Sequence, residues 1–193
     1  SHTPVDHIAG GSALLRQVPG LRILAEAGGA RFLREKKDPR RPVPTETFEG
    51  QRTLRVGSAT IELRKGRWHS PEGDLFIYLP DKRVLIAIDT LAAGHVPFMD
   101  FDLSTNMHAY LGVFDELLAY DFDTLVAGHL TYLADRSDVE TSKAYTMDVY
   151  TTVKRIHDGT DQMAVMSQAA ARYSWDNKFA LFRTLLDGVV DQC

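Results

Sequence analysis

The sequence predicts an α+β protein in which helices pack against a β-sheet. Two patterns support this: four strand-like segments lie between residues 52 and 88, and the chain beyond His129 has helical periodicity. Composition agrees, because 44% of the 193 residues are apolar and 25% are charged, which suits one compact domain with a sizeable core. Strands followed by helices, with further helices interleaved, are typical of a layered α+β or α/β/α sandwich.

Charge and cysteine content exclude several classes of protein. The net charge of -4 argues against a nucleic-acid partner, which favours clustered Lys and Arg. No stretch approaches the roughly 18 uncharged apolar residues that a membrane span needs. The single cysteine, Cys193, excludes an internal disulfide and suits a reducing compartment, although cytoplasmic and exported locations both stay open. Because Ser1 is not an initiator methionine, we expect a processed or trimmed chain, or a fragment.

The first part of the chain mixes loops with short elements. Residues 1–11 are expected to form a loop, followed by a weak helix over 12–18 and a short buried strand over 21–25. Residues 28–37 look helical, and we expect this helix to end at the proline-rich loop 38–44 because proline removes a backbone donor.

The central block predicts two hairpins. The first has strands at 52–56 and 60–64 around a turn at Gly57-Ser58, and both strands alternate in polarity. The second has buried strands at 74–79 and 83–88 around a turn at Pro80-Asp81.

Mostly helical segments follow. Residues 104–120 predict an amphipathic helix whose first turn Ser104 can cap, and 124–127 predict one more short strand. Beyond His129 we expect only helices, over 139–157, 161–173 and 177–190.

Histidines and acids stand at the ends of predicted strands or in tight loops. His69 follows one strand, Asp89 ends another, and His129 follows a third behind a glycine. Imidazole and carboxylate groups together suit zinc or iron. Each residue also has a plainer interpretation: a surface histidine, or for Asp89 a turn starter.

Taken together, four segments resemble the metallo-β-lactamase superfamily. That family has an H-x-H-x-D-H loop, a His before a Gly-rich turn, an Asp or Cys at a strand end, and a Gly-His at another strand end. The matching segments are H-T-P-V-D-H at 2–7, W-H-S-P-E-G-D at 68–74, A-I-D-T-L at 87–91 and V-A-G-H at 126–129. The order matches, the last three histidine or aspartate positions are 20 and 40 residues apart, and the resemblance covers about residues 1–130.

Two departures from the family pattern are visible. Pro4 stands where the family has its second His, and proline cannot ligate a metal. The family's strands before the His loop are also missing, so we expect an N-terminally incomplete αβ/βα four-layer sandwich with C-terminal helices. Residues 1–133 would form the metal-binding core and 134–193 a helical extension of the same domain.

The resemblance implies two adjacent metal sites. The first would hold His2 and His69, and the second Asp6, His7 and His129, with Asp89 bridging both. It implies one or two zinc ions, and hydrolysis in which a metal-activated hydroxide attacks the carbonyl of a small lactam, lactone, ester or thioester. Asp6 would orient the hydroxide and relay a proton to the leaving group.

Residues 91–103 follow Asp89 directly and carry several aromatic side chains. His95, Phe98 and Phe101 are candidates for a substrate-binding wall, and a place in the protein core is equally open for the aromatics.

Two other functions stay open. His2, His69 and Asp89 form a two-His, one-carboxylate set of the kind that binds non-haem iron, as in persulfide dioxygenases, which the resemblance includes. A decayed, non-catalytic binding module would explain Pro4. In each case we expect a small-molecule partner and no nucleic acid or membrane, with a homo-oligomer left open.

Overall fold

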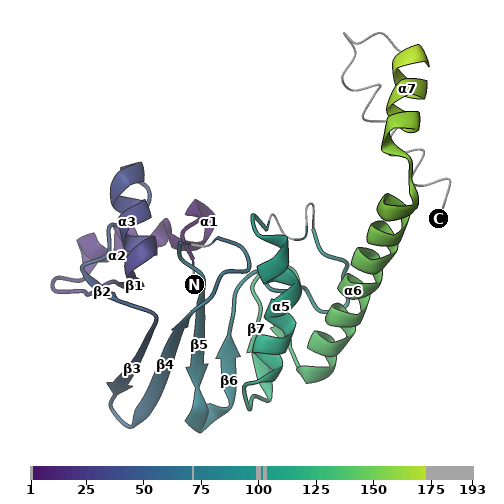
Figure 1. Cartoon of the computed structure of the whole chain (residues 1–193). Helices are drawn as coiled ribbons and strands as arrows, with labels where there is room; N and C mark the ends of the chain where they lie inside the picture. The colour runs from purple at the N-terminus through teal and green to yellow at the C-terminus, as the bar shows by residue number, and fades with distance from the viewer. Residues whose placement is uncertain (1, 71, 99–100, 102–103, 173–193) are drawn as a thin grey trace. The chain divides into compact units, whose positions relative to one another are not determined.

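The computed structural model describes residues 2–70, 72–98, 101 and 104–172. The chain divides into two compact units, Ser1–Ala144 and Tyr145–Cys193. Helices and strands alternate in the first unit, which confirms the predicted α+β class (Figure 1).

A six-stranded sheet organises the first unit, with the order β3-β4-β5-β6-β7-β8 (Figure 1). Its strands are β3 Gln51–Val56, β4 Ala59–Lys65, β5 Leu75–Leu79, β6 Val84–Ile86, β7 Thr124–Val126 and β8 Leu133–Ala134. Neighbouring strands run antiparallel except β6 and β7, which are parallel. Both predicted hairpins are confirmed. Strand β8 was not predicted, because the sequence after His129 indicated helices only.

The first hairpin turns where the sequence places a glycine. Gly57 has φ +61°, a left-handed conformation that glycine adopts without steric cost. The pairing of Val56 with Ala59 closes the turn.

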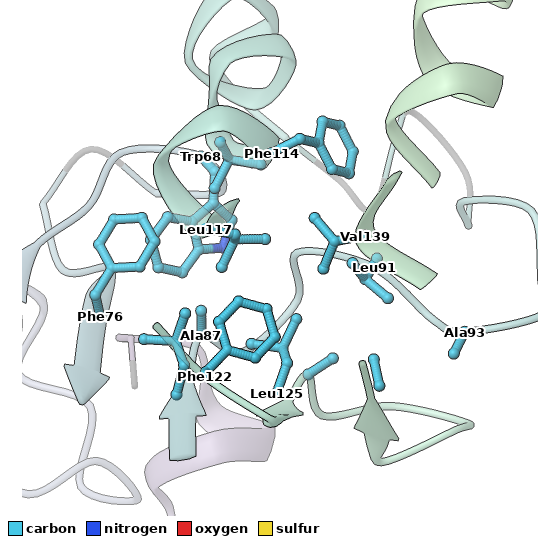
Figure 2. Close-up of a cluster of buried hydrophobic side chains, with 14 of the residues drawn as sticks. Trp68, Phe76, Ala87, Leu91, Ala93, Phe114, Leu117, Phe122, Leu125 and Val139 are labelled. Atoms are coloured by element: carbon cyan, nitrogen blue, oxygen red, sulfur yellow. The ribbon is translucent and has the colours of Figure 1, made fainter. Parts of the chain in front are cut away.

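Helix α5, Met107–Leu118, supplies much of the main core (Figure 2). Its side chains Val113, Phe114 and Leu117 are fully buried, with Trp68 beside them in the same cluster. Fully burying a side chain of this size contributes about 1.5–3 kcal/mol. The rest of the cluster comes from the sheet, its loops and the start of α6, and includes Phe76, Leu85, Leu91, Phe122, Leu125 and Val139.

The cap of α5 differs from the prediction. The helix begins at Met107, and the Asn106 side chain accepts a hydrogen bond from the backbone N–H of Ala109 at 3.1 Å. The hydroxyl of Ser104 donates instead to the carbonyl of Trp68. Ser104 therefore joins α5 to the loop before β5 rather than capping the helix.

A smaller substructure precedes the sheet. It contains α1 Val5–Ile8, α2 Gly10–Gln17, β1 Leu24–Glu26, α3 Ala27–Lys36 and β2 Glu46–Phe48, and β1 pairs in parallel with β2. The expected loop over 1–11 is wrong, because residues 5–8 form a helical turn and α2 begins at residue 10. Helix α3 ends, as predicted, just before the proline-rich loop, with Lys37 at φ +50°.

The remaining helices are α6, Arg136–Gly159, and α7, Gln162–Arg172. Helix α6 begins in the first unit and runs into the second, because the two units meet after Ala144. The expected division of one domain into a core over 1–133 and an extension over 134–193 stays a prediction. The helix predicted over 177–190 lies outside the described residues. None of the described helices has the length and apolar character that crossing a membrane requires.

Candidate metal centre

Histidines and aspartates from four separate segments meet at one end of the sheet. The Nε2 atoms of His2 and His7 each lie 3.1 Å from Oδ2 of Asp89, and Nε2 of His129 lies 3.5 Å from its Oδ1. Oδ2 of Asp6 lies 3.3 Å from Nε2 of His7. These contacts link five of the six predicted ligands, and the ring of the sixth, His69, stacks on that of His2.

The backbone around Asp89 holds this carboxylate in place. Asp89 follows β6 with φ +60°, an uncommon conformation for a residue other than glycine. Its N–H donates to the carbonyl of Ala127 at 2.8 Å, and the Trp68 indole donates to the preceding carbonyl of Ile88, also at 2.8 Å. A backbone held in a sparsely populated conformation by several bonds is characteristic of functional sites.

Gly128 lets the end of β7 come close to Asp89. It has φ +110°, and a Cβ added there would lie 2.9 Å from a methyl of Ile88 and 3.2 Å from Oδ1 of Asp89. Only glycine fits this approach, which brings His129 beside the carboxylate. This steric requirement explains why a glycine precedes His129 in the sequence.

Helix α1 presents Asp6 and His7. Pro4 is its N-cap residue, with an extended backbone at ψ 149°, and the N–H of His7 donates to the Pro4 carbonyl at 3.2 Å. The His7 side chain is 13% exposed and that of Asp6 58%. His7 therefore lies inside the cluster and Asp6 at its open side.

His2 lies deepest, with a fully buried side chain. Its ring stacks on the ring of His69, with centroids 4.7 Å apart and planes 20° apart. The fully buried Asp74 accepts hydrogen bonds from the backbone N–H groups of His69, at 2.7 Å, and Ser70, at 3.0 Å. This arrangement fixes the loop that carries His69.

Burial and neighbouring charge set the ionisation of the inner groups. Burial lowers the pKa of His2 below 6.5, although Asp89 opposes this. Burial would raise the pKa of Asp89, but contact with His2 and the charges of His2, His7 and His129 lower it below 3.8. Neutral imidazole and ionised carboxylate are the forms that bind metal ions.

The donor set fits a metal ion such as zinc. Among the described residues, two groups of three have ligand atoms within 4.8 Å of one another: His2, His7 and Asp89, and Asp6, His7 and His129. Two ligands about 2.0–2.2 Å from one tetrahedral ion lie roughly 3.3 Å apart, which agrees with the 3.1–3.5 Å separations around Asp89. Oδ1 of Asp89 is also buried and accepts no hydrogen bond from any described residue.

His69 belongs to neither of these groups. The resemblance implied a first site of His2, His69 and Asp89, whereas the structure combines His2 and Asp89 with His7. Which of these residues ligate a metal stays a prediction. Pro4, which stands at the position of the family's second His, lines the cavity together with the candidate ligands.

Solved structures identify the fold. A metallo-β-lactamase from Pontibacter korlensis superposes with a TM-score of 0.65 at 18% identity, over 76% of this chain and 66% of the other. The metallo-β-lactamase DIM-1 gives 0.63 at 18% identity over 77% and 66%, and TMB-1 gives 0.63 at 15% over 78% and 66%. The chain has the metallo-β-lactamase fold. The predicted resemblance is thereby confirmed for the fold.

Sequence comparison adds nothing to this identification. No family model matches the chain, and no curated protein matches it. The chain spans slightly less than two thirds of the length of the metallo-β-lactamases that it resembles.

A cavity of about 420 Å³ opens beside the donor cluster of this metallo-β-lactamase fold. Asp6, His7, His69, Asp89 and His129 form its polar side. Its apolar side comes from Pro4 before α1 and from the loops after β6 and β7, which supply Leu91, Ala92, Val96, Phe98, Ala127 and Leu130.

The three residues predicted to form a substrate wall, His95, Phe98 and Phe101, do not lie together. Phe98 lines the cavity. Phe101 packs against the main core, with its ring centroid 5.8 Å from that of Tyr110, and Nδ1 of His95 lies 3.0 Å from the carbonyl oxygen of Ala93. Neither Phe101 nor His95 is among the described residues that line the cavity.

Sequence reasoning named neither Val96 nor Leu130 as a candidate for the cavity lining. A usable signal was present for Leu130, because it is a large apolar residue directly behind the Gly128-His129 pair.

Proposed function

We propose that this protein is a metal-dependent hydrolase, with zinc as its ion, that acts on a small lactam, lactone, ester or thioester. The observation that carries the proposal is the set of three imidazole nitrogens within 3.1–3.5 Å of one carboxylate, beside a cavity of about 420 Å³. Cavities of this size accommodate small molecules.

His7, His129 and Asp89 would hold the ion, with His2 and Asp6 as further ligands. When bound, such an ion polarises a carbonyl group and lowers the pKa of water. The fold supports this function, because its solved neighbours are metallo-β-lactamases.

Asp6 is the residue best placed to handle protons. Its carboxylate lines the cavity and is more than half exposed, so it can take a proton from a water molecule there as that water attacks the carbonyl. The same group can then return the proton to the leaving group. Asp89 would have a different role, because its buried carboxylate faces the Nε2 atoms of His2 and His7 and would share the ion with them.

The test compares Asp6→Asn with the wild type for hydrolysis of p-nitrophenyl acetate, a thioester and a lactone. We expect zinc to be retained by the three histidines and Asp89, and kcat to fall about 10²–10⁴-fold, the usual contribution of a general acid–base group. Asp148→Asn, which changes an exposed residue on α6, is the matched control and keeps full activity. Unchanged kcat in Asp6→Asn would remove Asp6 from the mechanism, and absence of any hydrolysis by the zinc-loaded wild type would refute the proposal.

One observation favours a second candidate, an iron-dependent oxidoreductase. His2, His7 and Asp89 form a compact two-His, one-carboxylate group, which is the ligand set of many non-haem iron enzymes. Elemental analysis of the protein as purified decides between the two. Iron, together with dioxygen uptake in the presence of substrate, supports the oxidoreductase; zinc without such uptake supports the hydrolase.

A further inference from the structure

The cavity beside the donor cluster points to the substrate's chemical class. Building on the hydrolase proposed above, we propose that the substrate is a neutral ester, thioester or lactone whose apolar acyl group lies against Val96, Phe98 and Leu130. We call these three residues the apolar wall.

The apolar wall is exposed to an unusual degree for its residue types. Val96 is 63% exposed, Phe98 64% and Leu130 66%, and all three line the cavity. Single exposed apolar residues are ordinary, but several gathered at one cavity indicate a binding surface. A ligand that covers them removes apolar area from water, which favours binding by an apolar group.

The two loops that carry the apolar wall are bonded to each other. The hydroxyl of Thr131, in the loop after β7, donates to the carbonyl of Ala93, in the loop after β6, at 2.9 Å. The N–H of Ala127 donates to the carbonyl of Tyr132 at 2.9 Å and closes the second loop. Val96 and Leu130 thus stand on connected segments, as a preformed wall requires.

Charge then separates neutral from anionic substrates. The ionisable side chains of the cavity lining are two carboxylates and three imidazoles, and no Lys or Arg occurs among the described residues that line it. A carboxylate on the acyl group of the substrate would lie against the apolar wall without a cationic partner. Burying such a charge unpaired is strongly unfavourable. The acyl group is therefore both apolar and uncharged.

The first experiment measures kcat/KM of the zinc-loaded protein for p-nitrophenyl esters from acetate to octanoate. We expect about a fourfold rise for each added methylene until the cavity is filled, as apolar burial predicts. The p-nitrophenyl monoester of adipate, which is anionic, should react at least tenfold more slowly than its neutral methyl ester. Equal rates along the series, or equal rates for the adipate pair, would overturn the inference.

Variants assign the effect to the apolar wall. The double variant Val96→Ser, Phe98→Ser should flatten the dependence on chain length. Val56→Ser is the matched control, because Val56 is also 63% exposed but stands on β3 outside the cavity lining, and it should keep the wild-type dependence. A wild-type slope in the double variant would place the acyl group elsewhere.

A binding experiment separates this inference from the proposed hydrolase activity. The affinity of the zinc-loaded protein for 2-alkanones from hexanone to decanone, measured by calorimetry, should rise with chain length in the wild type and not in the double variant. If no ester is hydrolysed but the ketones behave this way, the hydrolase proposal fails and the apolar wall stands. If ester hydrolysis occurs but neither series depends on chain length, the apolar wall fails and the hydrolase stands.

Discussion

At Asp89, two imidazole nitrogens come within 3.1 Å of one carboxylate oxygen. One of these imidazoles, His2, is fully buried and has a lowered pKa because of its burial. A carboxylate oxygen that faces two imidazole nitrogens at this distance can share a cation with them, so we interpret this packing as a ligand set.

The first prediction compares Asp89→Ala with His2→Ala. Asp89 contacts three histidines: His2, His7 and His129. The ring nitrogens of His2 contact two carboxylates, those of Asp89 and Asp74. Asp89 contacts all three imidazoles and supplies the only carboxylate of the group formed by His2, His7 and Asp89, so Asp89→Ala should lose more zinc than His2→Ala. The measurement is zinc per chain at limiting zinc. Equal zinc contents in the two variants would show that Asp89 is not shared.

At the scale of elements, the connection between β7 and β8 decides where His129 stands. This connection contains two residues with positive φ, Gly128 at +110° and Leu130 at +57°. The backbone therefore reverses direction sharply just where it passes Asp89, and the glycine makes that passage sterically possible.

The second prediction concerns Gly128→Ala. The added methyl would collide with Ile88 in a conformation that alanine adopts poorly, so we expect a loss of about 1–3 kcal/mol in the free energy of unfolding. Urea denaturation measures it. Gly112→Ala is the matched control, because Gly112 lies inside α5 with open space around it, and this change should stabilise the protein by about 0.5–1 kcal/mol. A Gly128→Ala protein as stable as the wild type would contradict the steric explanation.

Elements with a strong local pattern were predictable from the sequence. The β3–β4 hairpin has alternating polarity and a glycine that fits its turn, and α5 has a clear apolar stripe. Strands β2 and β8, of three and two residues, carry no such pattern. They exist because other strands, β1 and β7, supply their hydrogen-bond partners.

The candidate site was predictable to a similar extent. The order of the motifs, and their places at strand ends and in loops, indicated which histidines and acids to consider. Both can be read from the sequence. The stacking of His2 on His69 was not predictable, since it depends on a loop that the buried Asp74 holds through backbone hydrogen bonds. The contacts of His2 and His7 with one oxygen of Asp89 likewise arise only from tertiary packing.

At the scale of the whole first unit, the donor cluster joins distant parts of the sequence. His7 and His129 are 122 residues apart in the chain, yet their Nε2 atoms lie 3.3 Å from each other. An unfolded chain cannot present these donors together, so a metal ion held by this cluster would bind the folded state selectively and stabilise it.

The third prediction follows from this linkage. Zinc at 100 times its dissociation constant should raise the free energy of unfolding by about 2.7 kcal/mol, which corresponds to an increase in Tm of roughly 5–10 °C for a chain of this size. Differential scanning calorimetry with zinc and with a chelator measures the increase. Magnesium is the control ion and should give a much smaller shift, because it prefers oxygen ligands and this cluster is rich in imidazole.

A variant carrying both Asp89→Ala and His129→Ala should lose most of the zinc effect while its chelator-treated form still unfolds cooperatively. If zinc raised the Tm of that variant as much as that of the wild type, the stabilising ion would be bound elsewhere, and the donor cluster would have to be explained without a metal.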